Sequence, residues 1–115
     1  MPDVDLLVLS AVSGVVANCW AVELPPDPAF PAAVFEVDSE PESGWVSLGV
    51  AVRTLHTVTV VVMARERALC KSLASGVRSA LEAQDCFFEA KSFGDADYER
   101  DASVFAQYLT VVFRT

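Results

Sequence analysis

The first apolar pattern in the chain is that of a helix over residues 4–16. Apolar side chains recur there every three or four residues, which places them on one face of a helix. They are Val4, Leu7, Val8, Ala11, Val12, Val15 and Val16. Asp3 stands where an N-cap is expected, and Asp5 favours the helix dipole in the first turn. Gly14 and the several valines lower the helix propensity, so we expect this helix to depend on tertiary packing.

A second helical pattern covers residues 65–83. Its apolar stripe consists of Leu69, Leu73, Val77, Ala80 and Leu81. The small side chains of residues 74–76 leave room for a sheet or another helix to approach closely.

The remaining apolar segments have the two-residue period of β-strands. We predict strands over residues 19–24, 33–38, 45–64, 86–90 and 105–114. In the second of these, Val34 and Glu36 share one face, and Phe35 and Val37 share the other. The third is most regular over residues 55–64 and becomes apolar on both faces, which favours a central position in a sheet.

Proline-rich or polar segments separate these elements. Residues 25–31 form a stiff proline-rich connector, residues 39–44 an acidic turn or loop, and residues 95–101 a charged turn. Neither a repeat nor an interdomain linker is visible, so we expect residues 1–115 to form one domain. The order of elements predicts the α+β class, with a single mostly antiparallel or mixed β-sheet packed against two α-helices. Both helices would lie on one face of the sheet and leave the other face open to a partner.

The composition changes this picture toward a subunit of an assembly. Apolar residues make up 53% of the chain, the mean hydropathy is +0.40, and only 21% of residues are charged, which excludes disorder. A chain of this size leaves roughly a third of its potential surface exposed. The apolar surplus therefore favours a homo-oligomer or a stable partner.

Cellular location is indicated by the cysteines and by the N-terminal segment. Cys19, Cys70 and Cys86 are widely spaced, which favours reduced thiols over a disulfide framework, although one disulfide is possible. The apolar residues 6–17 follow two aspartates instead of basic residues and are too few to span a bilayer. We expect a soluble protein that is cytoplasmic where it is made and that has no membrane association.

Charge is distributed unevenly along the chain. The protein has 8 Lys+Arg and 16 Asp+Glu, for a net charge of −8. The first basic residue is Arg53, so residues 1–52 contain half of the carboxylates and none of the bases. Binding to a phosphate backbone or to anionic lipid needs clustered Lys and Arg, so nucleic-acid binding is not expected.

Candidate catalytic and metal-binding residues are few. His56 is the single histidine and lies inside a predicted strand, so a Cys–His pair has no local sequence support. The histidine and the three scattered cysteines give no metal-ligand spacing. Asp95, Asp97, Glu99 and Asp101 alternate as in a calcium loop but lack its central Gly and terminal Glu. Phosphate-binding and nucleophile-elbow motifs are missing too, so we expect no enzymatic activity, no cofactor and no metal.

Arg65 and Arg67 stand at the predicted start of the second helix, where positive charge opposes the helix dipole. They are either exposed to solvent beside Glu66 or in contact with carboxylates of a neighbouring subunit. In the second case Lys71 belongs with them, and the acidic first half of the chain is the candidate partner.

The order of these segments resembles the tail terminator or tail-completion family of long-tailed bacteriophages, which also occurs in gene transfer agents. The resemblance begins with the N-terminal helix and the proline-bounded segments 24–25 and 30–35, which lead into an apolar strand. It continues through strand 58–63 into the helix with Leu69, Leu73, Val77, Arg78 and Leu81. It ends with the acidic turn 97–99 and the terminal strand 108–113. The resemblance therefore covers nearly the whole chain and rests on order and spacing, since no single motif is diagnostic.

This resemblance implies an α+β subunit that closes into a ring, a hexamer in this family. Such a ring caps the tail tube, ends its polymerisation and docks to the head-side connector or stopper protein. The implied partners are further copies of the chain, the tube protein and the connector. The implied location is the tail or neck of a virion, with assembly in the host cytoplasm. The family has no catalytic residue to carry over, and the base-free first half is a departure that leaves the partner surface undefined.

A ring needs two different contact patches on each subunit. At the subunit or partner interface we expect Arg65, Arg67, Lys71, Asp95, Asp97 and Glu99. DNA must pass through the bore of such a ring without binding, which favours an acidic lining. We therefore expect some of Glu36, Asp38, Glu40 and Glu42 to line the bore or an axial face.

Two other functions stay open from the sequence. A head–tail joining (neck) protein belongs to the same structural class. A small ligand-binding α+β oligomer belongs to a different class and would need a buried polar pocket, for which the chain offers few polar residues.

Overall fold

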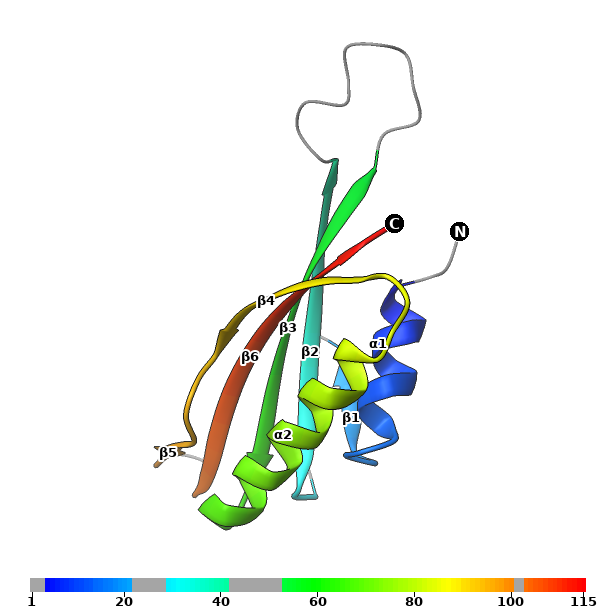
Figure 1. Ribbon diagram of the computed structural model, residues 1–115. Coiled ribbons are helices and arrows are strands. Elements are labelled where there is room, and N and C mark those ends of the chain that lie inside the picture. The colour runs from blue at the N-terminus through cyan, green and yellow to red at the C-terminus, as the bar shows by residue number, and fades with distance from the viewer. Residues whose placement is uncertain (1–3, 22–28, 42–52, 101–102) are drawn as a thin grey trace.

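The computed structural model describes residues 4–21, 29–41, 53–100 and 103–115, which form two helices and one six-stranded sheet (Figure 1). The helices are α1 (Val4–Ser13) and α2 (Arg67–Glu82). The strands are β1 (Cys19–Ala21), β2 (Ala32–Pro41), β3 (Thr54–Ala64), β4 (Phe87–Phe93), β5 (Asp97–Glu99) and β6 (Val104–Arg114). These elements confirm the predicted α+β class.

The sheet is mixed, with the strand order β1-β2-β3-β6-β4, and β5 pairs with β6 beside that path. β1 runs parallel to β2, and every other pair is antiparallel. β3 and β6 pair continuously from Leu55 opposite Arg114 to Ala64 opposite Phe105. The strand with the most regular apolar pattern in the sequence, β3, therefore has a neighbour on both sides, as the sequence predicts.

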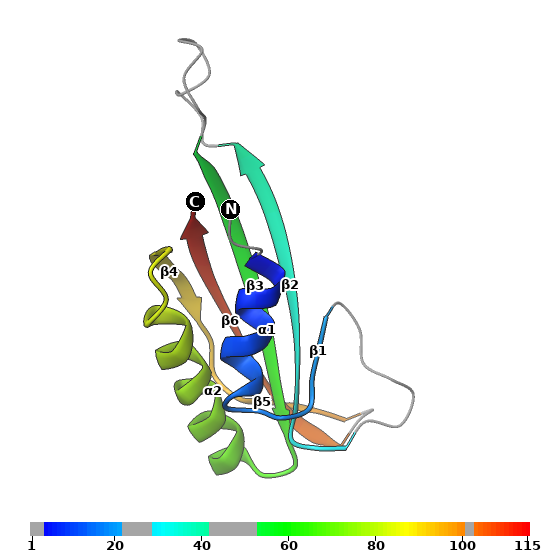
Figure 2. The same cartoon turned by 90° about the vertical axis from the view of Figure 1, so that its right-hand side faces the viewer.

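Both helices cover the same face of the sheet, which confirms the predicted layering (Figure 2). α1 packs over β1 and β2, whereas α2 packs over β3 and β6. The burial of β3 alternates accordingly: Val58, Val60 and Val62 are fully buried under the helices, and Thr57 and Thr59 are only half-buried. We call the face that turns away from the helices the open face.

The hydrophobic core lies between the helices and the sheet. Its largest fully buried side chain is Phe113 of β6, whose ring meets the ring of Phe87 edge-on at 6.4 Å between centroids. α1 contributes Val8 and Val12, and α2 contributes Val77. α1 stops at Ser13, before the predicted end, yet Val16 is only 1% exposed and belongs to the core, and its backbone N–H still donates to the carbonyl of Val12.

The small residues of α2 allow the two helices to approach closely, as their sequence positions predict. A Cβ atom added to Gly76 would lie 3.0 Å from Cγ1 of Val15, closer than ordinary van der Waals contact. Ala74, two residues earlier, is fully buried in the core. The helix pair therefore depends on the missing side chain of Gly76 at its contact point.

The structure corrects the predicted turn at residues 39–44. Residues 39–41 continue β2, and the pairing with β3 runs up to Pro41 opposite Thr54. Proline is tolerated in an edge strand, and among the described residues β1 covers β2 only at Ala33, Val34 and Phe35. The long ladder with β3 thus overrides the local turn signal. The predicted connector between residues 25 and 28, and the strand start at residues 45–52, lie outside the described residues.

The structure also corrects the charged turn predicted over residues 95–101. Asp97, Tyr98 and Glu99 form the short strand β5, which pairs with the start of β6. The ring of Tyr98 packs against that of Phe105 at 5.2 Å between centroids. This tertiary contact, which local polarity conceals, explains why the segment is extended. β4 similarly runs on to Phe93, beyond the predicted end at residue 90.

Candidate interaction surfaces

The acidic residues of β2 gather on the open face of the sheet. Glu36, Asp38 and Glu40 alternate along the strand and are all exposed, whereas Phe35 between them is buried under the helices. This arrangement confirms the two faces predicted for residues 33–38. Glu42, the fourth member of the predicted acidic face, lies outside the described residues.

The rest of the open face is polar beside these carboxylates and apolar farther along. Thr59 and Thr110 lie in line with Glu36, because the three residues are successive cross-strand partners. In the next row, Val34 and Val61 lie in line with Tyr108, whose side chain is 52% exposed. The open face therefore combines an acidic, threonine-rich half with an apolar half that includes Tyr108.

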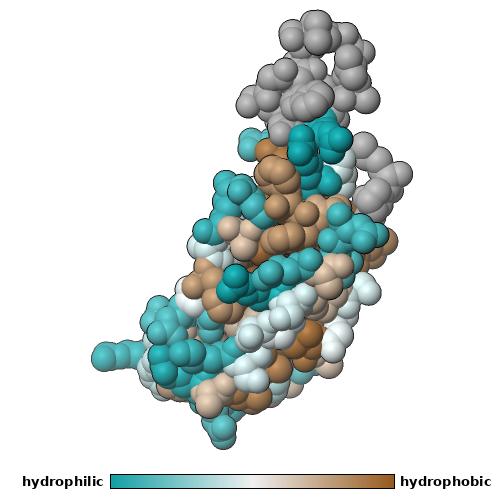
Figure 3. Space-filling model, viewed as in Figure 1, coloured by the Kyte–Doolittle hydropathy of each residue, from teal (hydrophilic) through white to brown (hydrophobic). Residues whose placement is uncertain are grey.

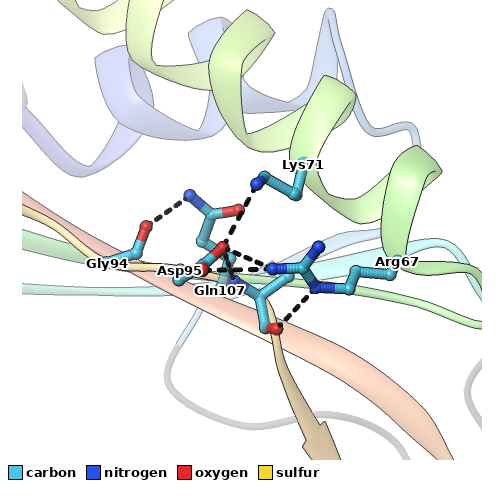
Figure 4. Close-up of polar contacts among 6 residues, drawn as sticks. Arg67, Lys71, Gly94, Asp95 and Gln107 are labelled. Carbon is cyan, nitrogen blue, oxygen red and sulfur yellow. Dashed lines mark hydrogen bonds and ion pairs between the residues drawn. The ribbon is translucent and has the colours of Figure 1, made fainter.

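A second surface lies at the start of α2, where three predicted interface residues meet (Figure 4). The guanidinium of Arg67 binds the carboxylate of Asp95 at 3.1 Å, and Nζ of Lys71 lies 3.4 Å from the same carboxylate. The backbone N–H of Ala96 donates to Oδ1 of Asp95 at 2.8 Å. That hydrogen bond and the ammonium of Lys71 lower the pKa of Asp95, so its carboxylate stays ionised. Hydrophilic residues dominate this region of the surface, over β5 and the neighbouring part of α2 (Figure 3).

Arg65 and Arg67 are both exposed, as one of the two sequence-based interpretations expects. Arg67 also has a carboxylate partner on the same chain, Asp95, which the sequence did not indicate. Arg65 precedes α2 and stacks over the ring of Phe30, with its guanidinium carbon 5.2 Å from the centroid. Asp97 and Glu99 are exposed on β5. A contact of any of these residues with a second subunit stays a prediction.

Gln107 of β6 binds the backbone of Gly94, the residue before Asp95 of this cluster, and the sequence did not point to it. Its side chain is only 2% exposed, and Nε2 donates to the carbonyl of Gly94 at 2.7 Å. The backbone N–H of Gly94 in turn donates to the carbonyl of Tyr108 at 3.0 Å. Oε1 of Gln107 has no hydrogen-bond partner within the described part of the chain. The one available signal was an amide on the inward side of an otherwise apolar strand.

A third surface is the edge strand β4, which sequence reasoning did not single out. Phe88 is 44% exposed and Phe93 is 38% exposed, on opposite faces of the strand. The guanidinium of Arg114 lies over Phe88 at 5.1 Å, and that of Arg78 lies over Phe93 at 4.7 Å. Each exposed ring of β4 is thus paired with an arginine from a neighbouring element.

The environments of the three cysteines do not activate their thiols as nucleophiles. Burial raises the pKa of Cys19 to about 11 and also raises those of Cys70 and Cys86, so all three thiols stay protonated at neutral pH. The three cysteines are free, as the spacing predicts. Within the described residues, no group of side chains suits a metal ion, no pocket is found, and no helix is long and apolar enough to cross a membrane.

On the helix-covered face, the side chain of His56 links the end of β2 to the residue that follows β6. Nδ1 of His56 lies 2.6 Å from Oγ of Ser39, and Nε2 lies 2.9 Å from Oγ1 of Thr115. Burial lowers the pKa of His56, and the opposing effect of the Asp5 charge is smaller. Its partners are hydroxyl groups, so the geometry indicates a structural hydrogen-bonded bridge between β2, β3 and the residue after β6.

We expect the free energy of unfolding to fall when the pH is lowered through the unfolded pKa of His56, which is 6.5. The folded pKa is the lower one, so in this range the unfolded chain binds a proton that the folded chain does not, and acid favours unfolding. Urea denaturation at pH 7.5 and 5.5 measures the effect. His56→Gln should show a smaller loss between the two pH values, and an equal loss in both proteins would contradict the assignment.

Comparisons with known proteins give the fold but no family. No protein-family model matches the chain, and no curated protein matches it. Among solved structures, the chain is similar to one described as "Virion of native gene transfer agent (GTA) particle", with a TM-score of 0.58 and 19% sequence identity. The match covers 90% of this chain and 82% of that chain. The two chains therefore share a fold over nearly their whole length.

Proposed function

We propose that this protein is a structural subunit of a phage-type virion, and within the virion the tail terminator. The observation that carries the proposal is the fold shared with a chain of a gene transfer agent virion over 90% of this chain. The order of elements in the sequence resembles the terminator family independently of that comparison. In this function the protein closes into a ring that caps the tail tube and docks to the head-side connector.

The two sides of the sheet differ in character. The open face carries the acidic residues of β2, and the opposite side of the sheet carries both helices and the Arg67–Lys71–Asp95 cluster. Head-to-tail contacts between subunits close into a ring when the rotation between neighbours allows it, and they leave one side of each subunit toward the bore and one side outward. We place the open face toward the bore, where Glu36, Asp38 and Glu40 repel the phosphates of passing DNA.

The test is the length of tubes formed by the tail tube protein in the presence of this protein. A terminator should bind the growing end and shorten the tubes as its concentration rises, and negative-stain electron microscopy should show annular particles of the protein alone. If annular particles form but tube length does not respond, the protein is a neck component instead. A protein that stays monomeric at all concentrations would contradict both structural functions.

A further inference from the structure

We propose that the β4 edge of one copy docks against the β2 edge of a second copy, so that their sheets join side by side. The proposal rests on the ring described above and names the surfaces that form it. By the β4 edge we mean Phe87–Phe93 with the side chains of Arg78 and Arg114. By the β2 edge we mean β2 from Glu36 to Pro41.

Both edges are unpaired in the described part of the chain. β4 has β6 as its strand neighbour on one side and no described strand on the other. β1 covers β2 only as far as Phe35. Exposed strand edges are pairing sites for other chains unless something covers them. The two edges also lie at opposite sides of the sheet, so each copy can use both at once and the chain of contacts runs head to tail (Figure 1).

The strand directions fit this continuation. β2, β3, β6 and β4 are antiparallel from neighbour to neighbour, so β2 and β4 run in opposite directions. In a ring whose axis follows the strands, every copy keeps the same strand direction. β4 of one copy then meets β2 of the next as an antiparallel pair, and the alternation continues from subunit to subunit. No strand has to reverse, and the open face stays on one side of the joined sheet.

The β4 edge exposes the aromatic and arginine side chains that are typical of the centre of a protein–protein interface. Aromatic residues and arginine are enriched among the residues that dominate the binding energy of protein interfaces. β4 exposes Phe88 and Phe93, and each ring lies under an arginine side chain. The β2 edge offers carboxylates on the face of Arg114, because Glu36, Asp38 and Glu40 are exposed there.

Charge also favours the pairing of β4 with β2 over the pairing of two identical edges. Two β2 edges would bring Glu36, Asp38 and Glu40 against their own copies, and like charges across a strand pair are destabilising. Two β4 edges would bring two arginines from each copy together and pair Lys91 with Glu89, so they gain less from charge than β4 gains against the acidic β2 edge. Glu89 is the acidic residue within β4, and Glu82 already binds Arg78 at 2.6 Å. The Arg114 end of β4 and the distal acidic end of β2 are opposite in charge and level in the sheet, because Arg114 and Glu40 both pair with Leu55.

The first experiment compares Phe88→Asp with Tyr108→Asp in native mass spectrometry and sedimentation velocity. Tyr108 is a matched control, because it is an aromatic residue that is 52% exposed on the open face of β6 and lies outside both edges. Phe88→Asp should raise the concentration needed for half-assembly by about tenfold or more, in line with the loss of a central aromatic contact. Tyr108→Asp should assemble like the wild type. Circular dichroism checks that both variants fold.

The second experiment exchanges charges between the edges. Arg114→Glu alone and Asp38→Arg with Glu40→Arg should each prevent assembly, because each makes the two edges alike in charge. Mixing these two variants should restore assembly, with the variants alternating and only even-numbered rings detected. Rings from every variant alone would overturn the edge contact while leaving the ring itself standing. A wild-type protein that never assembles would instead overturn the ring, and this proposal with it.

Discussion

Phe113→Ala is expected to lower the free energy of unfolding by about 3–5 kcal/mol, as removal of a buried aromatic ring does in other cores. Phe113 is the largest fully buried side chain. Its ring contacts the ring of Phe87 and lies in the core between the sheet and the helices. Removing the ring deletes buried apolar area and leaves a cavity that β6, paired with β3 and β4, cannot collapse to fill.

Urea denaturation at one fixed protein concentration measures the change, since assembly would otherwise add to the apparent stability. Thr110→Ala is the control, because Thr110 lies on the same strand but is half-buried on the open face. Phe113→Leu should fall between the wild type and Phe113→Ala. A loss below about 1 kcal/mol for Phe113→Ala, the level of an ordinary surface change, would show that the core is not organised around this ring.

The elements that could be predicted from the sequence are those whose burial follows a regular period. Val58, Val60 and Val62 alternate with half-buried residues, so the strand and its two faces are visible in the sequence. In α2, Val77 and Leu81 of the predicted stripe are buried, whereas Leu69 at its start is 40% exposed, so the pattern marks the covered face only in the later turns. In these segments local pattern and tertiary packing favour the same structure, so the prediction holds.

The errors fall where contacts distant in sequence decide the local structure. Pro41 and its acidic neighbours have the composition of a turn, but the ladder with β3 extends the strand to that residue. Tyr98 lies among charged residues, but its contact with Phe105 makes the segment a strand. Propensity is a weak prior in both cases because pairing with an existing strand stabilises the extended backbone.

The candidate surfaces were predicted only in part for the same reason. The alternation of Val34 and Glu36 with Phe35 and Val37 predicts two faces for residues 33–38, which the structure confirms, whereas Glu40 was expected in a turn. The pairing of Arg67 with Asp95 joins residues 28 positions apart, and nothing in either segment indicates the other. The arginine–phenylalanine pairs of β4 are likewise visible only once β6 and α2 are placed beside it.

The proposed placement of the open face toward the bore of a ring predicts that the double variant Thr59→Lys with Thr110→Lys binds DNA that is threaded through the ring. These threonines lie on adjacent central strands of the open face, away from both sheet edges, so the variant should still assemble. Each subunit then adds two lysines to the bore. DNA held there should bind with a salt dependence that steepens by about 0.9 in log–log slope for each phosphate neutralised. The wild-type ring, with its acidic face, should bind no DNA under the same conditions.

The decisive comparison is between linear and closed circular DNA of the same sequence. A preformed ring can take up linear DNA through an end, whereas a closed circle offers no end, so the variant should retain only the linear form in a filter-binding or gel-shift assay. Ser72→Lys with Ser79→Lys is the matched control, because it adds the same charge to the exposed side of α2, on the helix-covered side of the sheet. That control should bind both forms alike, since its lysines lie outside the bore. Equal binding of linear and circular DNA by the threonine variant would mean that the open face lies on the outside of the assembly, and the acidic residues of β2 would then face another partner.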